Sequence, residues 1–162
     1  MNQYCVVVAN GTKARFFTLE APDRPEVESG PNLIKQKDLT NFEQQGESET
    51  LWTETKSGGN RGHGGQSHGY DDHRARHEDD VERRFANSIA DECKRFSHNK
   101  NSNVVLVSQK RMLGHLRNAI DTRLSGVKTQ ELAKDLCKLS PQEIHQHLAK
   151  EHIIPERRPP TL

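Results

Sequence analysis

Hydrophobic residues are distributed along the chain as short continuous runs near its start and as helical stripes farther on. The apolar, β-branched run Tyr4–Ala9 ends at Asn10-Gly11, which predicts a central strand followed by a tight turn. Lys13–Leu19 is then expected to pair back as a hairpin, and the less apolar Leu33–Leu39 to form a third strand nearer an edge. The chain is therefore predicted to begin with three antiparallel strands.

Helices and strands are predicted to alternate in the second half. Apolar residues recur every three or four positions on one side of a predicted helix, namely Val81, Phe85, Ile89, Cys93 and Phe96. The apolar run Val104–Val107 predicts a strand buried on both faces, followed by a second amphipathic helix that Gly126 closes. Val127–Leu132 predicts either a further strand or an extended connection. Ser140 opens a capping box, which predicts the start of a final helix.

A long polar segment separates the third predicted strand from the first predicted helix. Ser57–Asp80 contains six of the eleven glycines and four of the nine histidines, so it cannot bury enough apolar surface to join a core. We predict an exposed, glycine-rich loop over about residues 53–72. Asp71 and Asp72 are expected to cap the helix that starts near His73.

The overall composition is that of one small domain. With 162 residues, 31% of them hydrophobic and 29% charged, we predict a single α/β domain over residues 1–152 and a flexible C-terminal tail over 153–162. The N-terminal residues lack the basic segment and the long apolar run of an export signal, which favours a cytoplasmic protein without a membrane partner. The three widely spaced cysteines are expected to be reduced and mostly buried.

The formal net charge of +1 provides no general basic field of the kind that many nucleic-acid-binding proteins carry, and no DNA contact is expected. RNA contacts would have to be local. The candidate basic residues are Lys56, Arg61, Arg74, Arg76, Lys110, Arg111, Arg117, Arg157 and Arg158. For Arg74, an i,i+4 ion pair with Glu78 is an equally well supported alternative. The same holds for Arg76 and Asp80.

The centre of the predicted loop carries a short motif with a specific resemblance. The string His63-Gly64-Gly65-Gln66-Ser67 is followed by a predicted helix that opens with two arginines. This order resembles the middle, catalytic domain of the archaeal and eukaryotic class 1 peptide release factors. That family carries a Gly-Gly-Gln tripeptide in a basic, glycine-rich loop, with a histidine before it, a serine after it and an arginine-bearing helix next.

The order of the predicted elements extends this resemblance over nearly the whole chain. Three antiparallel strands followed by alternating helices and strands are similar to the ribonuclease H-like mixed sheet of the release-factor middle domain. The motif Leu113-Gly114-His115-Leu116-Arg117, which follows an apolar strand, further resembles bacterial relatives of these factors that are catalogued as "host attachment" proteins.

The resemblance implies a function in translation. Gly64, Gly65 and Gln66 would be catalytic, because the glycines permit unusual backbone conformations and the backbone amide of Gln66 would stabilise an oxyanion. That oxyanion forms when water attacks the ester of peptidyl-tRNA. The ribosome and peptidyl-tRNA would be the partners, and no cofactor is implied. The implied RNA-binding residues are Arg61, His63, Ser67, Arg74 and Arg76.

Other interpretations of the same residues are open. The Gly-Gly-Gln string also fits an incidental feature of a flexible linker, and the fold fits a non-catalytic RNA- or ribosome-binding module. A protein that affects attachment to host cells is a third class. His73 and His77 share a helix face and would offer two ligands to a transition metal, with Asp72 or His68 as the next. Their spacing matches no defined zinc pattern, so no metal is predicted.

Overall fold

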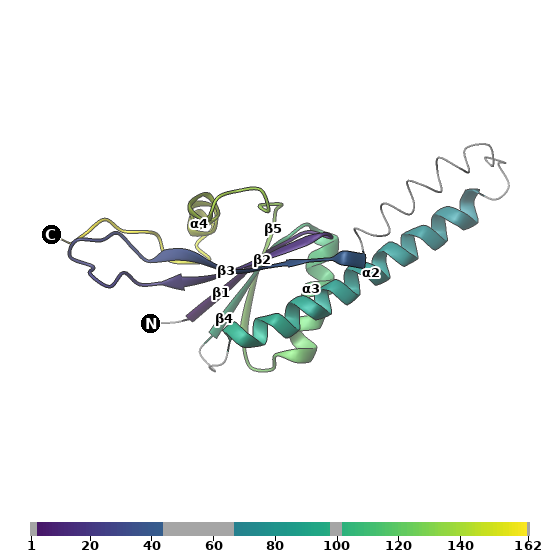
Figure 1. Ribbon diagram of the computed structural model, residues 1–162, viewed down its shortest axis with the longest axis horizontal. Helices are drawn as coiled ribbons and strands as arrows, with labels where there is room; N and C mark the ends of the chain where they lie inside the picture. The colour runs from purple at the N-terminus through teal and green to yellow at the C-terminus, as the bar shows by residue number, and fades with distance from the viewer. Residues whose placement is uncertain (1–2, 44–66, 98–101, 162) are drawn as a thin grey trace.

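The computed structural model describes residues 3–43, 67–97 and 102–161, which form a five-stranded mixed sheet with helices on both faces (Figure 1). The strands are β1 (Gln3–Ala9), β2 (Lys13–Glu20), β3 (Asn32–Thr40), β4 (Ser102–Ser108) and β5 (Lys128–Ala133). The helices of this described part are α2 (Ser67–Phe96), α3 (Lys110–Arg123) and α4 (Pro141–Lys150). The predicted α/β class is confirmed.

The sheet has the strand order β3-β2-β1-β4-β5. β1 pairs antiparallel with β2, and β2 with β3, whereas β4 runs parallel to both of its neighbours, β1 and β5. The predicted tight turn is present, because Asn10 Oδ1 accepts hydrogen bonds from the backbone N–H groups of Thr12 and Lys13 at 2.9 and 2.8 Å. Of the two options predicted for residues 127–132, the structure has a strand, β5.

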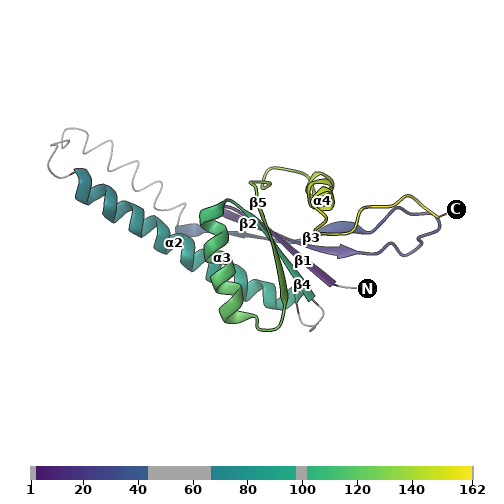
Figure 2. The ribbon, with the colours of Figure 1, turned by 180° about the vertical axis from the view of Figure 1, so that it is seen from behind.

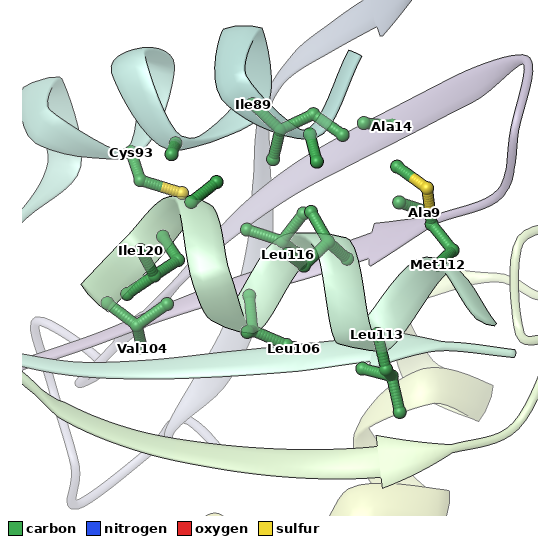
Figure 3. Packing of buried hydrophobic residues seen from close by; sticks show 14 of the residues in the cluster. Ala9, Ala14, Ile89, Cys93, Val104, Leu106, Met112, Leu113, Leu116 and Ile120 are labelled. Atoms are coloured by element: carbon green, nitrogen blue, oxygen red, sulfur yellow. The ribbon is translucent and has the colours of Figure 1, made fainter. Parts of the chain in front are cut away.

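Both faces of the central strands are buried. In β1, Cys5 and Val7 belong to a core cluster shared with α2 and α3, whereas Val6 and Val8 belong to a second cluster shared with α4. β4 alternates between the two clusters in the same way. Figure 3 shows the first cluster, to which α2, α3 and β4 all contribute apolar side chains. The parallel pair of β1 and β4 is thus the centre of the fold.

Two helix ends follow the predicted local signals. Ser140 Oγ accepts the backbone N–H of Glu143 at 3.2 Å, and the Glu143 carboxylate accepts the backbone N–H of Ser140 at 3.2 Å. These two bonds complete the predicted capping box of α4. Gly126, predicted to close α3, lies two residues beyond the C-cap Leu124 and has a φ of +86°, a left-handed conformation that favours glycine.

Helix α2 projects away from the sheet (Figures 1 and 2). Its C-terminal half carries the predicted apolar stripe, which begins with the buried Val81. Residues 73–77 are exposed, and the part of the helix from Ser67 to Asp80 is about 20 Å long. Neither α2 nor any other described helix is both long and apolar enough to cross a membrane.

The start of α2 differs from the prediction. The helix begins at Ser67 and not near His73, so Asp71 and Asp72 lie within it and do not precede it. Once a helix is anchored, each further residue adds a hydrogen bond without the cost of nucleation, and residues 67–72 contain no proline and only one glycine. The helix therefore extends into the end of the predicted loop. The rest of that loop, residues 53–66, lies outside the described residues.

The C-terminal segment, predicted to be a flexible tail, makes defined contacts with the connection between β2 and β3. Arg158 and Gly30 form an antiparallel bridge in which each backbone N–H donates to the other carbonyl, at 2.8 and 3.0 Å. Ile154 is only 4% exposed and joins the core cluster shared with α4. The residues that hold this segment are far away in the sequence and cannot be found from a local pattern.

The substitution Ile154→Ala tests how much this segment contributes to stability. Because the side chain is buried, we expect the free energy of unfolding to fall by about 2–5 kcal/mol, the usual effect of truncating a buried isoleucine. Chemical denaturation followed by circular dichroism measures the change. Glu156→Ala, at an exposed position of the same segment, is the control and should change stability by less than about 0.5 kcal/mol. Equally small effects of both substitutions would contradict the packing of Ile154.

Candidate functional site

The residues that the resemblance marks as catalytic fall in a part of the chain that the structure does not describe. Gly64, Gly65 and Gln66 lie outside the described residues, as do Arg61 and His63. Ser67, the next residue in the sequence, is the first residue of α2. The structure therefore describes the chain before and after the segment that contains the predicted catalytic string, up to residue 43 and from residue 67.

The two described ends of this segment lie far apart. At one end, the Glu43 carboxylate accepts a 3.1 Å hydrogen bond from Arg84 Nε, which fixes the chain beside the middle of α2. At the other end, Ser67 lies at the projecting end of α2 (Figure 1). The stretch of helix from Arg84 back to Ser67 is roughly 25 Å long. Residues 44–66 thus connect the base of the projecting helix with its first residue.

The two arginines that were predicted to contact RNA from α2 have different surroundings. Arg74 Nε lies 3.3 Å from Glu78 Oε1, so the ion pair that the spacing supported is present. Arg76 is exposed and forms no ion pair with a described residue. Asp80, its suggested partner, pairs with Arg83 at 2.9 Å instead. Of the two arginines, Arg76 is therefore the one whose guanidinium is available to an external partner.

For the alternative metal site on the N-terminal half of α2, the described residues provide no third ligand. His73 and His77 are exposed, and the further ligands considered with them, His68 and Asp72, lie outside the described side chains. Neither of the two exposed histidines belongs to a described group of three metal-ligating side chains.

The predicted motif of residues 113–117 joins α3 to its neighbours. Its two leucines are buried in the core cluster shared with α2 and α3. His115 Nε2 lies 2.8 Å from Asp79 Oδ1 of α2. Arg117 donates from Nε and a terminal nitrogen to both carboxylate oxygens of Glu131 in β5, at 2.7 and 2.6 Å. Arg117, a candidate for RNA contact, is thus engaged in a bidentate ion pair within the protein.

Four polar side chains meet between α2 and α3, close to the point where α2 leaves the sheet, and we call them the interhelical cluster. They are Asp79 and Glu82 of α2 and Arg111 and His115 of α3. Arg111 Nε lies 3.0 Å from Glu82 Oε2 and 3.6 Å from Asp79 Oδ1. His115 and Glu82 are largely buried, with 15% and 19% of the side chain exposed, whereas about half of the other two side chains is exposed.

Electrostatics within the interhelical cluster favour the charged form of Asp79. The hydrogen bond to His115 lowers the pKa of Asp79 most, the charges of Arg111 and Arg83 lower it further, and burial opposes them. The β1–β2 turn closes over the other acid of the cluster, because a Cβ atom at Gly11 would lie 3.3 Å from Glu82 Oε1. The cluster is therefore covered on one side and open to solvent on the other.

Analysis of the sequence did not identify the interhelical cluster as a site. Arg111 was considered only as a candidate for RNA contact, and His115 only as part of the motif of residues 113–117. The available signal was the spacing, since Asp79 and Glu82 are three residues apart and Arg111 and His115 four apart, so that each pair shares a helix face. That the two faces meet is a property of the tertiary structure alone.

The other candidates for RNA contact are only partly available. Arg157 Nε donates a 2.8 Å hydrogen bond to Asn32 Oδ1, which ties it to the start of β3. Lys110 and Arg158 form no ion pair with a described residue, and Lys56 lies outside the described residues. Basic side chains without a described acidic partner thus occur in several elements, with Arg76 on α2, Lys110 at the start of α3 and Arg158 in the C-terminal segment.

The cysteines are free, as predicted, and at least partly buried. The contact with Cys5 and burial raise the pKa of Cys93, and burial raises the pKa of Cys137 to about 11. Cys93 and Cys137 are therefore protonated near neutral pH and are weak nucleophiles, which argues against a catalytic cysteine at either position.

The Arg117–Glu131 pair predicts a pH-dependent contribution to stability. The hydrogen bond from Arg117 lowers the pKa of Glu131 below its ordinary value of 4.5, while burial opposes it. A carboxyl group with a lower pKa in the folded state stabilises the fold above its unfolded pKa, and this contribution is lost as pH falls through the folded pKa. We expect the wild-type protein to have a higher free energy of unfolding than Glu131→Gln. This difference should be largest near neutral pH and should shrink below about pH 4.5.

Urea denaturation of both proteins over a series of pH values measures this difference. Glu26→Gln, at an exposed glutamate without a described ion pair, is the matched control and should differ from wild type by an amount that does not vary with pH. A constant difference between wild type and Glu131→Gln would show that the ion pair does not contribute to stability.

Comparison with known proteins places the chain in a family. A search among curated proteins finds no match. The sequence profile of a family described as "Protein required for attachment to host cells" matches residues 5–148, from β1 through most of α4. This match covers the sheet except for the first two residues of β1, and it includes the interhelical cluster and the motif of residues 113–117. The chain therefore belongs to the family described as "Protein required for attachment to host cells".

Proposed function

We propose that this protein associates with the ribosome and hydrolyses peptidyl-tRNA, in peptide release or ribosome rescue, through Gly64, Gly65 and Gln66. The observation that carries the proposal is the position of these residues in the chain. They directly precede Ser67, the first residue of a helix that projects about 20 Å from the sheet. A catalytic string next to the end of such a projection would reach the end of a tRNA that is enclosed by the ribosome. The sheet would stay outside that enclosed space.

The proposed chemistry needs few groups from the protein. Water attacks the ester carbonyl that links the peptide to the tRNA, and the negative charge that develops on the carbonyl oxygen requires a fixed hydrogen-bond donor. The backbone N–H of Gln66 would be that donor, and its side chain would shape the site of the attacking water. The two glycines would allow the backbone to approach the tRNA closely. The terminal ribose hydroxyl of the tRNA would help to move protons, as the resemblance to release factors implies.

The fold supports this proposal as a platform. We propose a ribonuclease H-like mixed sheet related to the middle domain of the release factors, and the described succession of elements is compatible with it. Three antiparallel strands come first, and helices and strands then alternate. α2, which follows the Gly-Gly-Gln string, is held at its base by apolar packing and by the interhelical cluster. A firm base is what a projecting catalytic element needs in order to position its reactive groups.

The family description suggests how the proposal relates to attachment. A requirement for attachment to host cells would follow indirectly if release or rescue of stalled ribosomes controlled the synthesis of the proteins that make the contact. A non-catalytic ribosome-binding module of the same fold is the second candidate. The observation that favours it is the exposed Arg76, which forms no described ion pair and needs no catalytic loop to bind RNA.

Release of a labelled nascent peptide from stalled ribosome complexes tests the catalytic proposal. Wild type should release the peptide. Gln66→Pro removes the proposed donor N–H, and Gly65→Ala restricts the backbone that aims it, so each should lower the release rate about 10²–10³-fold. Gln66→Ala keeps the N–H and loses only the side chain, and we expect a smaller decrease of about tenfold or more.

The control variants change the same residue types in the same segment. Gln45→Ala and Gly46→Ala should release peptide at the wild-type rate. If wild type binds ribosomes without releasing peptide, the binding-module function replaces the catalytic one. If wild type neither binds nor releases, both proposals are wrong.

Arg76→Gln tests whether the projecting half of α2 contacts RNA. We expect weaker sedimentation with ribosomes and a slope of log affinity against log salt that is smaller by about 1, because one phosphate contact is lost. Arg95→Gln is the matched control, since it removes the same charge from the other end of α2, where Arg95 lies 3.5 Å from Glu92. Equal effects of the two substitutions would mean that only net charge matters and would contradict a contact at Arg76.

A further inference from the structure

We infer that Asp79, Glu82 and His115 of the interhelical cluster form a binding site for a divalent transition-metal ion of the Zn²⁺ class. One ligand atom from each of these side chains lies within 4.8 Å of the other two. They come from two helices that pack against each other, Asp79 and Glu82 from α2 and His115 from α3. No residue of the proposed catalytic string takes part, so the site is independent of peptidyl-tRNA hydrolysis.

The donor set determines which ion fits. One imidazole nitrogen and two carboxylate oxygens suit Zn²⁺ better than Mg²⁺ or Ca²⁺, which prefer oxygen ligands alone. Zinc bonds to such ligands are about 2.0–2.2 Å long, so donors around one ion lie roughly 3–4 Å apart. The donor atoms of Asp79 and His115, now 2.8 Å apart, must separate slightly, whereas the widest spacing in the group, at most 4.8 Å, must close by about 1 Å. The 48% exposed Asp79 has the freedom to move. With three protein ligands and an open side, water would complete the coordination.

One oxygen of the cluster lacks the partner that burial requires. Glu82 Oε2 is buried, yet it accepts no hydrogen bond from a described residue. Arg111 Nε lies 3.0 Å from it, but its N–H is not aligned for a hydrogen bond, so the contact is an ion pair only. A buried carboxylate oxygen without a hydrogen bond costs free energy, and a metal ion would satisfy it directly.

Arg111 would compete with the ion. Its guanidinium lies near both acidic ligands, so it neutralises them in the absence of metal and repels a divalent cation. Half of the Arg111 side chain is exposed, which leaves it free to turn toward solvent when an ion binds. Removing this charge should strengthen metal binding, whereas removing a ligand should weaken it. These opposite effects distinguish a metal site from an ion-pair network.

Isothermal titration of the full chain with Zn²⁺ tests the site. We expect binding that Glu82→Gln and His115→Ala each weaken by about tenfold or more, since even partners that only orient metal ligands contribute 10–100-fold to affinity. Arg111→Gln should bind Zn²⁺ about tenfold or more tightly than wild type, because a neighbouring positive charge is gone. The double variant His73→Ala/His77→Ala, which removes the exposed histidine pair of α2, is the control and should bind like wild type.

Circular dichroism and the unfolding midpoint of each variant separate loss of a ligand from loss of the fold. The inference is wrong if wild type takes up no Zn²⁺, and equally if only Arg111→Gln binds, because the guanidinium would then be the permanent cation of the cluster. It is also wrong if binding survives in folded Glu82→Gln and His115→Ala but disappears in the His73→Ala/His77→Ala variant. That result would place the ion on the exposed face of α2.

Discussion

The position of α2 depends on apolar packing along only one half of the helix. Phe85, Ile89 and Cys93 are buried in the core cluster shared with α3 and the sheet, and burying each large apolar side chain contributes about 1.5–3 kcal/mol. Residues 73–77 are exposed and lack such packing. A separate helix as short as the projecting part would be marginal in water. That part is helical because it continues a helix whose other half is already fixed.

Polar contacts at the base determine the direction in which α2 projects. Lys37 of β3 pairs with Glu92 at 3.0 Å, Arg84 pairs with Glu43 at 3.1 Å, and the interhelical cluster joins α2 to α3. Partly exposed pairs of this kind contribute about 0–1 kcal/mol each, far less than the apolar stripe. Their effect is geometric, because contacts on different sides of the helix restrict how it can pivot on its apolar face.

The features predicted correctly from the sequence are those encoded by neighbouring residues. The Asn10-Gly11 turn, the apolar run in β4 and the capping box at Ser140 each depend on a few consecutive side chains. The start of α2 was wrong because propagation from an anchored half overrides weak local capping signals. The packing of Ile154 and the interhelical cluster were missed because they join segments distant in the sequence. The proposed catalytic string rests on a resemblance and lies outside the described residues, which resume at Ser67.

Under the proposed function, the internal pairing of basic residues limits how RNA can be recognised. Arg111 and Arg117 are held by acidic partners of the same chain, and the net charge is only +1. Long-range electrostatic attraction to RNA is therefore weak, and each phosphate contact must come from an individual side chain such as Arg76. Affinity would then depend on a partner that encloses the projecting half of α2 and contacts it on several sides. Under the proposed function, the shape of α2 rather than a basic surface would provide recognition, and loosening its base would impair binding even with every exposed arginine intact.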